Sequence, residues 1–331
     1  MKIVRLILLI LHIGIFFLLV GMLLNAYVPP KVFPWFNLLS LAFPGLIFGY
    51  VVITLFWIFS WKKRAFVFLF LGLFFFNSTM RWVNYSPTKN ETPDLKVISL
   101  NAKNGNLGVK NIESFVNAQK ADVVLLQEYG GNRDYHFEGL KRFPDTAIVA
   151  VFSKFKIIQH KGLVKSNFDH TNVYVSQTDI DVNGNICRFI NVHLQPFRFE
   201  KKMINLGEND KQGEEKLKNI VKRLIPVFKI HQDEVANVKK AVENSPYPVI
   251  LAGDFNSVPN SYEYYHLLNG MQDCFVEAGK GSATSFHDYK FPIRIDYIFA
   301  SKSIKPISYK VDRSVKISDH FPVIATFKLE K

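Results

Sequence analysis

The stretch ILAGDFNSVPN, residues 250–260, contains a short apolar run that stops at Gly253 and gives way to an acid and an amide. Asp254 and Asn256 follow the glycine with one residue between them. Because alternate side chains of a β-strand share a face, these two side chains are expected to lie together where the strand ends. Alone, the pattern is more often an ordinary turn that ends a strand, since Asp and Asn side chains bond their own backbone.

Strand-like and helical patterns alternate on both sides of this stretch. Amphipathic helices are expected at 109–120 and 261–270, and a charged helical segment at about 199–245 is expected to be kinked or divided by Pro226. The sequence DVNGN (181–185) is a hairpin turn signal. Many strands with few helices predict an α/β domain of stacked sheets flanked by helices. The expected strands are 95–101, 121–128, 146–153, 172–182, 186–194, 247–256, 293–301 and 320–330.

The first 83 residues have a different composition and are predicted to lie in a membrane. Residues 1–90 contain eight Lys or Arg and no Asp or Glu, so much of the formal net charge of +13 belongs to this part. Apolar runs near 3–24 and 38–61 are long enough to cross about 30 Å of hydrocarbon as helices. A third run, 65–83, reaches spanning length with its weakly polar end included. We expect three spans; the alternative is two spans and a re-entrant piece.

Basic residues predict the orientation of these spans. Lys2 and Arg5 flank the first run, and the basic residues 62–64 separate the second from the third. The positive-inside rule puts both groups in the cytoplasm. With three spans, the polar linker 84–94 and the globular domain 95–331 lie outside the cytoplasm, in the periplasm or at the cell surface. With two spans they lie inside.

Polar residues of similar chemistry stand where the expected strands of the globular domain start or end. Strands of a common sheet bring such ends to one edge, so carboxylates, amides and imidazoles are expected to share a pocket. Mg²⁺ prefers oxygen ligands, and imidazoles suit proton transfer or stabilisation of charge on a phosphate. The sequence contains no zinc-type Cys/His cluster and no P-loop. The residues are Asn101, Glu128, His193, Asp254, Asn256, Asp296, Asp319 and His320.

The motifs LNAKNG, LLQE, NVHL, GDFNSVP, RIDYIF and SDHFPV occur in an order that carries a family resemblance. Residues 95–330 resemble the endonuclease/exonuclease/phosphatase superfamily, which includes deoxyribonuclease I-like nucleases, neutral sphingomyelinases and inositol polyphosphate 5-phosphatases. The resemblance implies a four-layer sandwich of two stacked mixed β-sheets flanked by helices. It also implies Mg²⁺ as the cofactor, with Mn²⁺ as a substitute, and in-line attack of water on a phosphodiester or phosphomonoester.

The resemblance further implies a role for each site residue. Asp254 corresponds to the acid that orients or deprotonates the attacking water, and Asp296 orients the imidazole of His320. The implied catalytic residues are Asp254, Asn256, His320, His193 and Asp296. The implied metal ligands are Glu128, Asn101 and Asp319. The implied contacts of the substrate phosphate are Asn256, His193 and His320.

The sequence therefore predicts a membrane-anchored, Mg²⁺-dependent phosphoesterase that acts on a lipid phosphate, a nucleic acid or a small phosphodiester. Its expected partners are this substrate and the lipid bilayer, with no obligate protein partner inferred. Lys103 stands where the apurinic endonucleases of the superfamily carry an acid, which argues against that branch. The alternative is a catalytically inactive, membrane-bound binding or scaffold module of the same fold.

Overall fold

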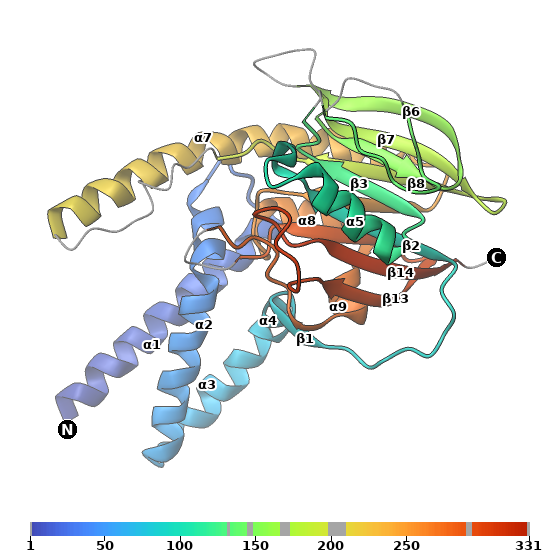
Figure 1. Cartoon of the computed structure of the whole chain (residues 1–331). Coiled ribbons are helices and arrows are strands. Elements are labelled where there is room, and N and C mark those ends of the chain that lie inside the picture. Colours follow the sequence, from blue (N-terminus) through green and yellow to red (C-terminus); the bar gives the residue numbers. More distant parts are fainter. Residues whose placement is uncertain are drawn as a thin grey trace.

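Two six-stranded sheets stack face to face in the computed structural model (Figure 1), which describes residues 2–130, 133–143, 148–165, 173–197, 210–288 and 293–329. The first sheet has the order β10 (Met271–Asp273), β12 (Asp296–Ser301), β9 (Val249–Asp254), β8 (Asn185–His193), β7 (Val173–Val182) and β6 (Lys156–Lys165). The second has the order β13 (Ile304–Val311), β14 (Val323–Leu329), β2 (Leu95–Asn101), β3 (Val123–Gln127), β5 (Ala150–Ser153) and β4 (Lys141–Arg142).

Both sheets are mixed, as the sequence predicts. Strand β8 runs parallel to β9, and β2 runs parallel to β3, while the other neighbours are antiparallel. The predicted hairpin between β7 and β8 is also present, with Asn183 and Gly184 both at positive φ. This geometry is that of a type I′ turn, which Asn-Gly favours.

Helices cover the outer faces of the two sheets and complete four layers. A buried apolar cluster between the sheets contains side chains from both, including Val97, Val323, Phe189 and Ile250. Helix α5 (Val109–Gln119) packs its apolar face on the second sheet. Helices α7 (Asp210–Glu243) and α8 (Tyr262–Leu268) pack on the first sheet. The predicted four-layer sandwich is therefore confirmed.

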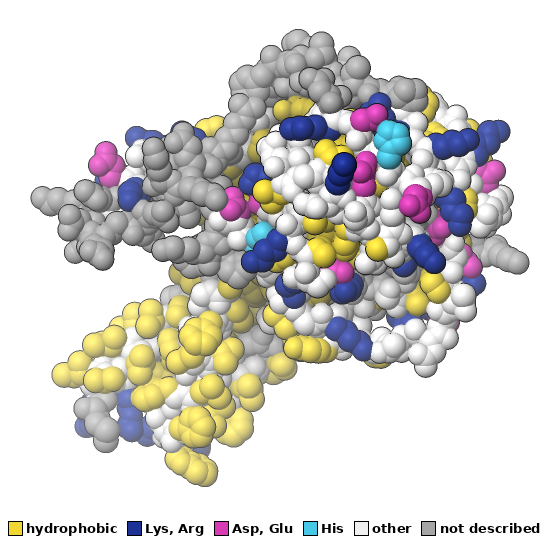
Figure 2. Space-filling model, in the orientation of Figure 1, with side chains coloured by type: hydrophobic (Ala, Val, Ile, Leu, Met, Phe, Trp, Pro, Cys, Tyr) yellow, Lys and Arg dark blue, Asp and Glu magenta, His cyan; other side chains and the backbone are white. Residues whose placement is uncertain are grey.

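The N-terminal helices form an apolar bundle beside this sandwich. Helix α1 (Lys2–Leu23) continues into a short 3-10 turn, η1 (Leu24–Ala26), and packs on α2 (Trp35–Phe59). The third segment consists of α3 (Arg64–Gly72), the 3-10 turn η2 (Leu73–Phe75) and α4 (Phe76–Met80). Large apolar side chains stay exposed over the bundle (Figure 2), including Phe17, Phe48, Phe66 and Phe70.

The three segments differ in length. Among the described residues, Lys2–Ala26 and Trp35–Phe59 are long and apolar enough to cross a membrane, while Arg64–Met80 is shorter. At 1.5 Å per residue, this third helical segment spans about 25 Å. The chain N-terminus and the α2–α3 connection lie at the free end of the bundle, and η1 and α4 lie near the sandwich (Figure 1).

Polar contacts attach the bundle to the sandwich. Asn37 on α2 donates to Glu263 on α8 at 3.0 Å, and its oxygen accepts from the backbone nitrogen of Tyr262. Arg81, just after α4, donates to the side chain of Asn260 at 2.7 Å, and Asn25 donates to the Asn260 carbonyl. The following strand β1 (Val83–Tyr85) pairs with β11 (Lys280–Ser282), and irregular chain then leads to β2.

Some expectations about single elements need correction or fall outside the described residues. Pro226 lies inside α7 and does not divide it, because the helix is continuous from Asp210 to Glu243. The start of the charged helical segment expected at 199–245, up to residue 209, lies outside the described residues, as do residues 146–147 and 172 of two expected strands. Short helix α9 (Cys274–Ala278), not predicted, lies beside β12 and β13.

Candidate active site

Strand register brings three of the predicted site residues side by side. Asp254 ends β9, and its neighbours across the first sheet are His193 on β8 and Asp296 on β12. The parallel pairing of β8 and β9 places both carboxyl ends at one edge, whereas antiparallel β12 contributes its first residue there. In the second sheet, Asn101 ends β2, and Glu128 directly follows β3.

Close approach of β8 and β9 explains the glycine before Asp254. Gly253 has φ +142°, and a Cβ at this position would lie 1.9 Å from the carbonyl oxygen of Val192. No side chain fits at that distance, so the sequence needs glycine here to bring the acid beside His193. Gly253, which ends the apolar run in the sequence, is therefore required for the packing of the site.

Asp254 lies at the centre of a hydrogen-bonded group and is almost completely buried. Asn101 Nδ2 donates to Asp254 Oδ2 at 3.0 Å and to Glu128 Oε1 at 3.3 Å. The backbone nitrogen of Asn256 donates to Asp254 Oδ1 at 2.8 Å. Asn101 thus orients two carboxylates, while its own oxygen accepts from the backbone nitrogen of Lys103.

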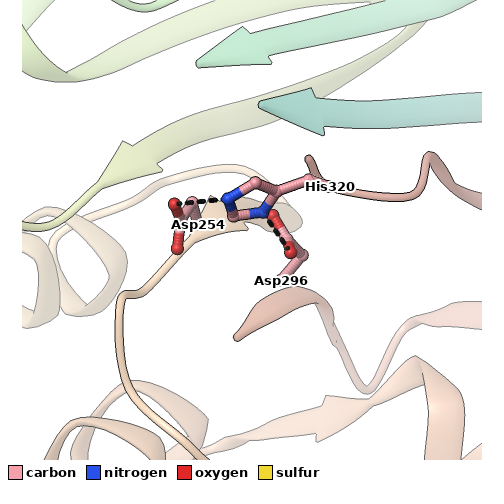
Figure 3. A group of neighbouring side chains, drawn as sticks. All are labelled: Asp254, Asp296 and His320. Atoms are coloured by element: carbon pink, nitrogen blue, oxygen red, sulfur yellow. Dashed lines mark hydrogen bonds and ion pairs between the residues drawn. The ribbon is translucent and has the colours of Figure 1, made fainter. Parts of the chain in front are cut away.

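His320 lies between two carboxylates (Figure 3). Its Nδ1 lies 2.8 Å from Asp296 Oδ2, and its Nε2 lies 3.8 Å from Asp254 Oδ2. Burial alone lowers the pKa of His320, but the carboxylates of Asp296 and Asp254 outweigh burial and raise this pKa to about 10. The imidazole is therefore a cation at neutral pH, and Asp296 fixes the direction in which its Nε2–H points.

His193 lies behind the two carboxylates. Its ring nitrogens are 3.6 Å from Asp254 Oδ2 and from Glu128 Oε1, its side chain is 2 % exposed, and its ring stacks on Tyr174. Burial alone raises the pKa of Asp254, but the charges of His320 and His193 outweigh it and lower this pKa. Asp254 therefore stays ionised at neutral pH, as a carboxylate that accepts a proton must.

Two site residues adopt backbone conformations that are uncommon for residues with a side chain. Glu128 has φ +45° and Asn256 has φ +46°. Such left-handed conformations cost free energy and concentrate at functional sites, where the surrounding structure enforces them. Asn256 is held by its side-chain nitrogen, which donates to the carbonyl of Leu194 at 2.9 Å.

Asp319 has a partner that the sequence alone did not suggest. Its Oδ2 lies 2.7 Å from Lys103 Nζ, and the same ammonium group lies 3.4 Å from Asp288. Burial alone lowers the pKa of Lys103, but its contact with Asp319 outweighs burial and raises it. Nothing in the local sequence signals this ion pair, because Lys103 and Asp319 are far apart in the chain.

A cavity of about 450 Å³ opens in front of these residues. It is lined by five of the eight predicted site residues: Glu128, Asp254, Asn256, Asp319 and His320. The other three, Asn101, His193 and Asp296, support these side chains from behind and are not among the described lining residues. The structure thus brings all eight together, and it separates those that face the cavity from those that hold them.

The donor atoms fit a divalent metal ion. Glu128 offers a carboxylate that is 29 % exposed towards the cavity, with Asp254 close by. Asp254, Asp296 and His320 also place one possible ligand atom each within 4.8 Å of one another. Carboxylate oxygens are the ligands that Mg²⁺ prefers. Since the Asp296–His320 hydrogen bond already occupies one ring nitrogen, Glu128 is the more open donor.

Two family models match the chain. Residues 98–320 match the model described as the Endonuclease/Exonuclease/phosphatase family. Residues 5–82 match a model described as a domain of unknown function (DUF8431). No curated protein matches the chain.

Solved structures share the fold of the sandwich. One is humanized D. rerio TDP2 with 14 mutations, which is 16% identical, with a TM-score of 0.50, over 71% of this chain and 98% of that one. Another is an endonuclease/exonuclease/phosphatase family protein from Leptotrichia buccalis, 17% identical, with a TM-score of 0.50, over 71% of this chain and 100% of that one. At these identities, the likeness shows the fold alone.

Proposed function

The chain belongs to the endonuclease/exonuclease/phosphatase family, and on this premise we propose that it is a membrane-anchored, divalent-metal-dependent hydrolase of phosphate esters. The observation that carries the proposal is the position of His320, held at 2.8 Å by Asp296 and facing Asp254 at the wall of a cavity. This arrangement supplies an ionised carboxylate at the end of β9 and an imidazolium in the loop before β14.

These side chains suit the attack of water on phosphorus. Asp254, kept ionised by the two imidazoles, orients the water and accepts its proton. The water oxygen bonds to phosphorus as the ester P–O bond breaks. His320 presents Nε2–H to a phosphate oxygen, where negative charge increases in the transition state. The second amide hydrogen of Asn256 is directed to the same phosphate.

We assign the metal to Glu128, with Asn101 beside it and Asp319 as a further contact. Mg²⁺, when bound there, offsets the charge of the phosphate group, and Mn²⁺ substitutes for it. The hydrogen bonds from Asn101 to Glu128 and Asp254 support this assignment, because they hold both carboxylates towards one point.

The N-terminal bundle supports a membrane location. Two of its helices have the length and composition of membrane spans, and many large apolar side chains on its outer surface are exposed rather than packed against protein. Positive residues stand at α1's start and in the α2–α3 connection, which both lie at the free end of the bundle (Figure 1). By the positive-inside rule that end is cytoplasmic, so the sandwich lies outside the cytoplasm.

Hydrolysis of bis-(p-nitrophenyl) phosphate by the purified full chain tests this function. We expect activity only with Mg²⁺ or Mn²⁺, and a fall of about 10²–10⁴-fold in kcat for His320→Ala and Glu128→Ala. His136→Ala is the matched control, because His136 is 82 % exposed on another part of the surface. Undiminished kcat in His320→Ala would reject the assignment, whereas no hydrolysis by the unmodified chain with either metal ion would favour the inactive scaffold.

A further inference from the structure

The cavity in front of the catalytic residues has a polar end and a lining that is otherwise largely apolar, with Asn37, Ser40, Ser257 and Ser261 as further polar side chains. Asp254 and His320 line the polar end, whereas α7 contributes Ile220, Leu224 and Phe228 to the wall. The described lining residues include no Lys or Arg. A nucleic acid needs basic side chains along its phosphates, and a sugar phosphate needs polar partners for its hydroxyl groups. The wall therefore matches a substrate that has hydrocarbon next to its phosphate.

One part of the wall comes from the membrane bundle itself. Ser40 and Leu41 of α2 line the cavity, and Leu41 is 39 % exposed, so this side of the cavity reaches the surface. Phe48, Val52 and Leu55 are also exposed and lie on the same helix face as Leu41, at positions 7, 11 and 14 residues further on. A continuous apolar stripe thus runs along α2 to the cavity.

Helix α7 carries a second apolar stripe to the same place. Leu217, Ile220, Leu224 and Phe228 follow at helical spacing of three or four residues. Their exposure falls along the helix, from 58% at Leu217 to 4% at Leu224 and 3% at Phe228. The N-terminal half of α7 extends outwards past α1 and α2 (Figure 1), so the stripe begins outside the sandwich and ends beside the site.

We propose that the substrate is a lipid phosphate ester taken from the bilayer around the bundle. Its hydrocarbon chain lies between α2 and α7, and its phosphate contacts His320 and Asn256, beside the water that Asp254 orients. This assignment of the substrate class rests on the proposed phosphoesterase function. The reaction is hydrolysis: water adds to phosphorus, the P–O bond to the alcohol breaks, and the alcohol oxygen leaves with a proton.

A series of p-nitrophenyl alkyl phosphodiesters, from methyl to dodecyl, separates the two proposals. The full chain is assayed with Mg²⁺ in maltoside micelles, whose headgroup contains no phosphate. We expect kcat/KM to rise at least about tenfold from methyl to dodecyl, because each buried methylene favours binding. Leu41→Ser and Ile220→Ser should lower the dodecyl rate about tenfold and leave the methyl rate unchanged.

Matched controls separate the cavity from partition into the micelle. Phe66→Ser changes an exposed residue of α3 outside the cavity, and Ile158→Ser changes an exposed residue of β6; neither should alter the dodecyl-to-methyl ratio. No hydrolysis of any ester in the series would reject the phosphoesterase function. Three outcomes would overturn the lipid substrate alone. The first is hydrolysis of the methyl ester with no gain in kcat/KM from a longer chain, and the second is a gain that survives in Leu41→Ser and Ile220→Ser. The third is faster cleavage of a single-stranded oligodeoxynucleotide.

Discussion

At the scale of single residues, the site depends on how Asp296 holds His320. Asp296→Asn keeps the shape of the side chain but removes the carboxylate that fixes the imidazole and raises its pKa. We expect kcat for bis-(p-nitrophenyl) phosphate to fall about 10²-fold or more, with little change in the unfolding temperature. Asp134→Asn, at a side chain 89 % exposed, serves as the control. Unchanged kcat for Asp296→Asn would show that His320 needs no orienting partner.

Gly253 predicts a second effect at this scale, on stability rather than chemistry. Gly253→Ala would push a methyl group to 1.9 Å from the Val192 carbonyl oxygen, so β8 and β9 would have to separate. We expect a loss of more than about 3 kcal/mol in the free energy of unfolding, measured by denaturant titration. Gly184→Ala, in the hairpin turn with open space around it, should cost only about 1 kcal/mol.

The polar residues of the site are those the sequence could predict. Each stands at or near a strand end, and the register of the first sheet brings His193, Asp254 and Asp296 together. Which of the residues face the cavity could not be predicted, because that depends on side-chain direction across two sheets. The ion pair of Lys103 and Asp319 was missed for a similar reason, since it joins residues distant in the chain. The roles of the individual residues stay predictions.

At the scale of elements, the missed strands are mainly edge strands. Strand β13 contains Pro306, and a proline in a sequence argues against a central strand. In the structure, β13 lies at the sheet edge and has a register shift beside that proline. Strand β6 is the other sheet's edge and has three register shifts. Neither strand has the regular alternation of apolar and polar residues that predicts a half-buried strand. The central strands β3 and β9, in contrast, were predicted closely because burial on both faces makes them apolar over most of their length.

A buried network joins three helices and predicts a pH-dependent stability. His231 on α7 lies 2.8 Å from Glu263 on α8, which also accepts from Asn37 on α2. Burial alone lowers the pKa of His231 and raises that of Glu263, but their mutual contact outweighs burial and reverses both directions. The histidine's contribution to stability is complete below about pH 6.5, its ordinary pKa, and is lost as the pH rises through the raised value.

The glutamate's contribution is complete above about pH 4.5 and is lost as the pH falls through its lowered pKa. Glu263→Gln should therefore lower the unfolding temperature most between pH 4.5 and 6.5, at a cost of about 3 kcal/mol, and less as the pH rises beyond this window. Thermal unfolding at pH 6 and pH 9 measures the difference. Glu214→Gln, at a carboxylate 69 % exposed, should have almost no effect. An equal loss at both pH values would contradict the ion pair.

At the scale of the whole molecule, the arrangement of the bundle predicts its orientation in the membrane. The segments α1, α2 and α3–α4 run alternately, so the chain N-terminus and the sandwich lie at opposite ends (Figure 1). A reporter that is active only outside the cytoplasm, fused after residue 331 and expressed in a bacterial host, should be active. A reporter fused after residue 62 should be inactive. Inactive reporters in both fusions would mean that the third segment does not cross.

The contacts between bundle and sandwich have a consequence for kinetics. Asn25, Asn37 and Arg81 fix the sandwich to the bundle, so in the proposed membrane location the site is held at one height rather than on a swinging tether. An enzyme held in this way meets a lipid by lateral diffusion in two dimensions. Its rate is then set by the mole fraction of substrate in the surrounding leaflet. Diluting that leaflet with inert lipid slows the reaction, even when the total amount of substrate per volume of water is unchanged.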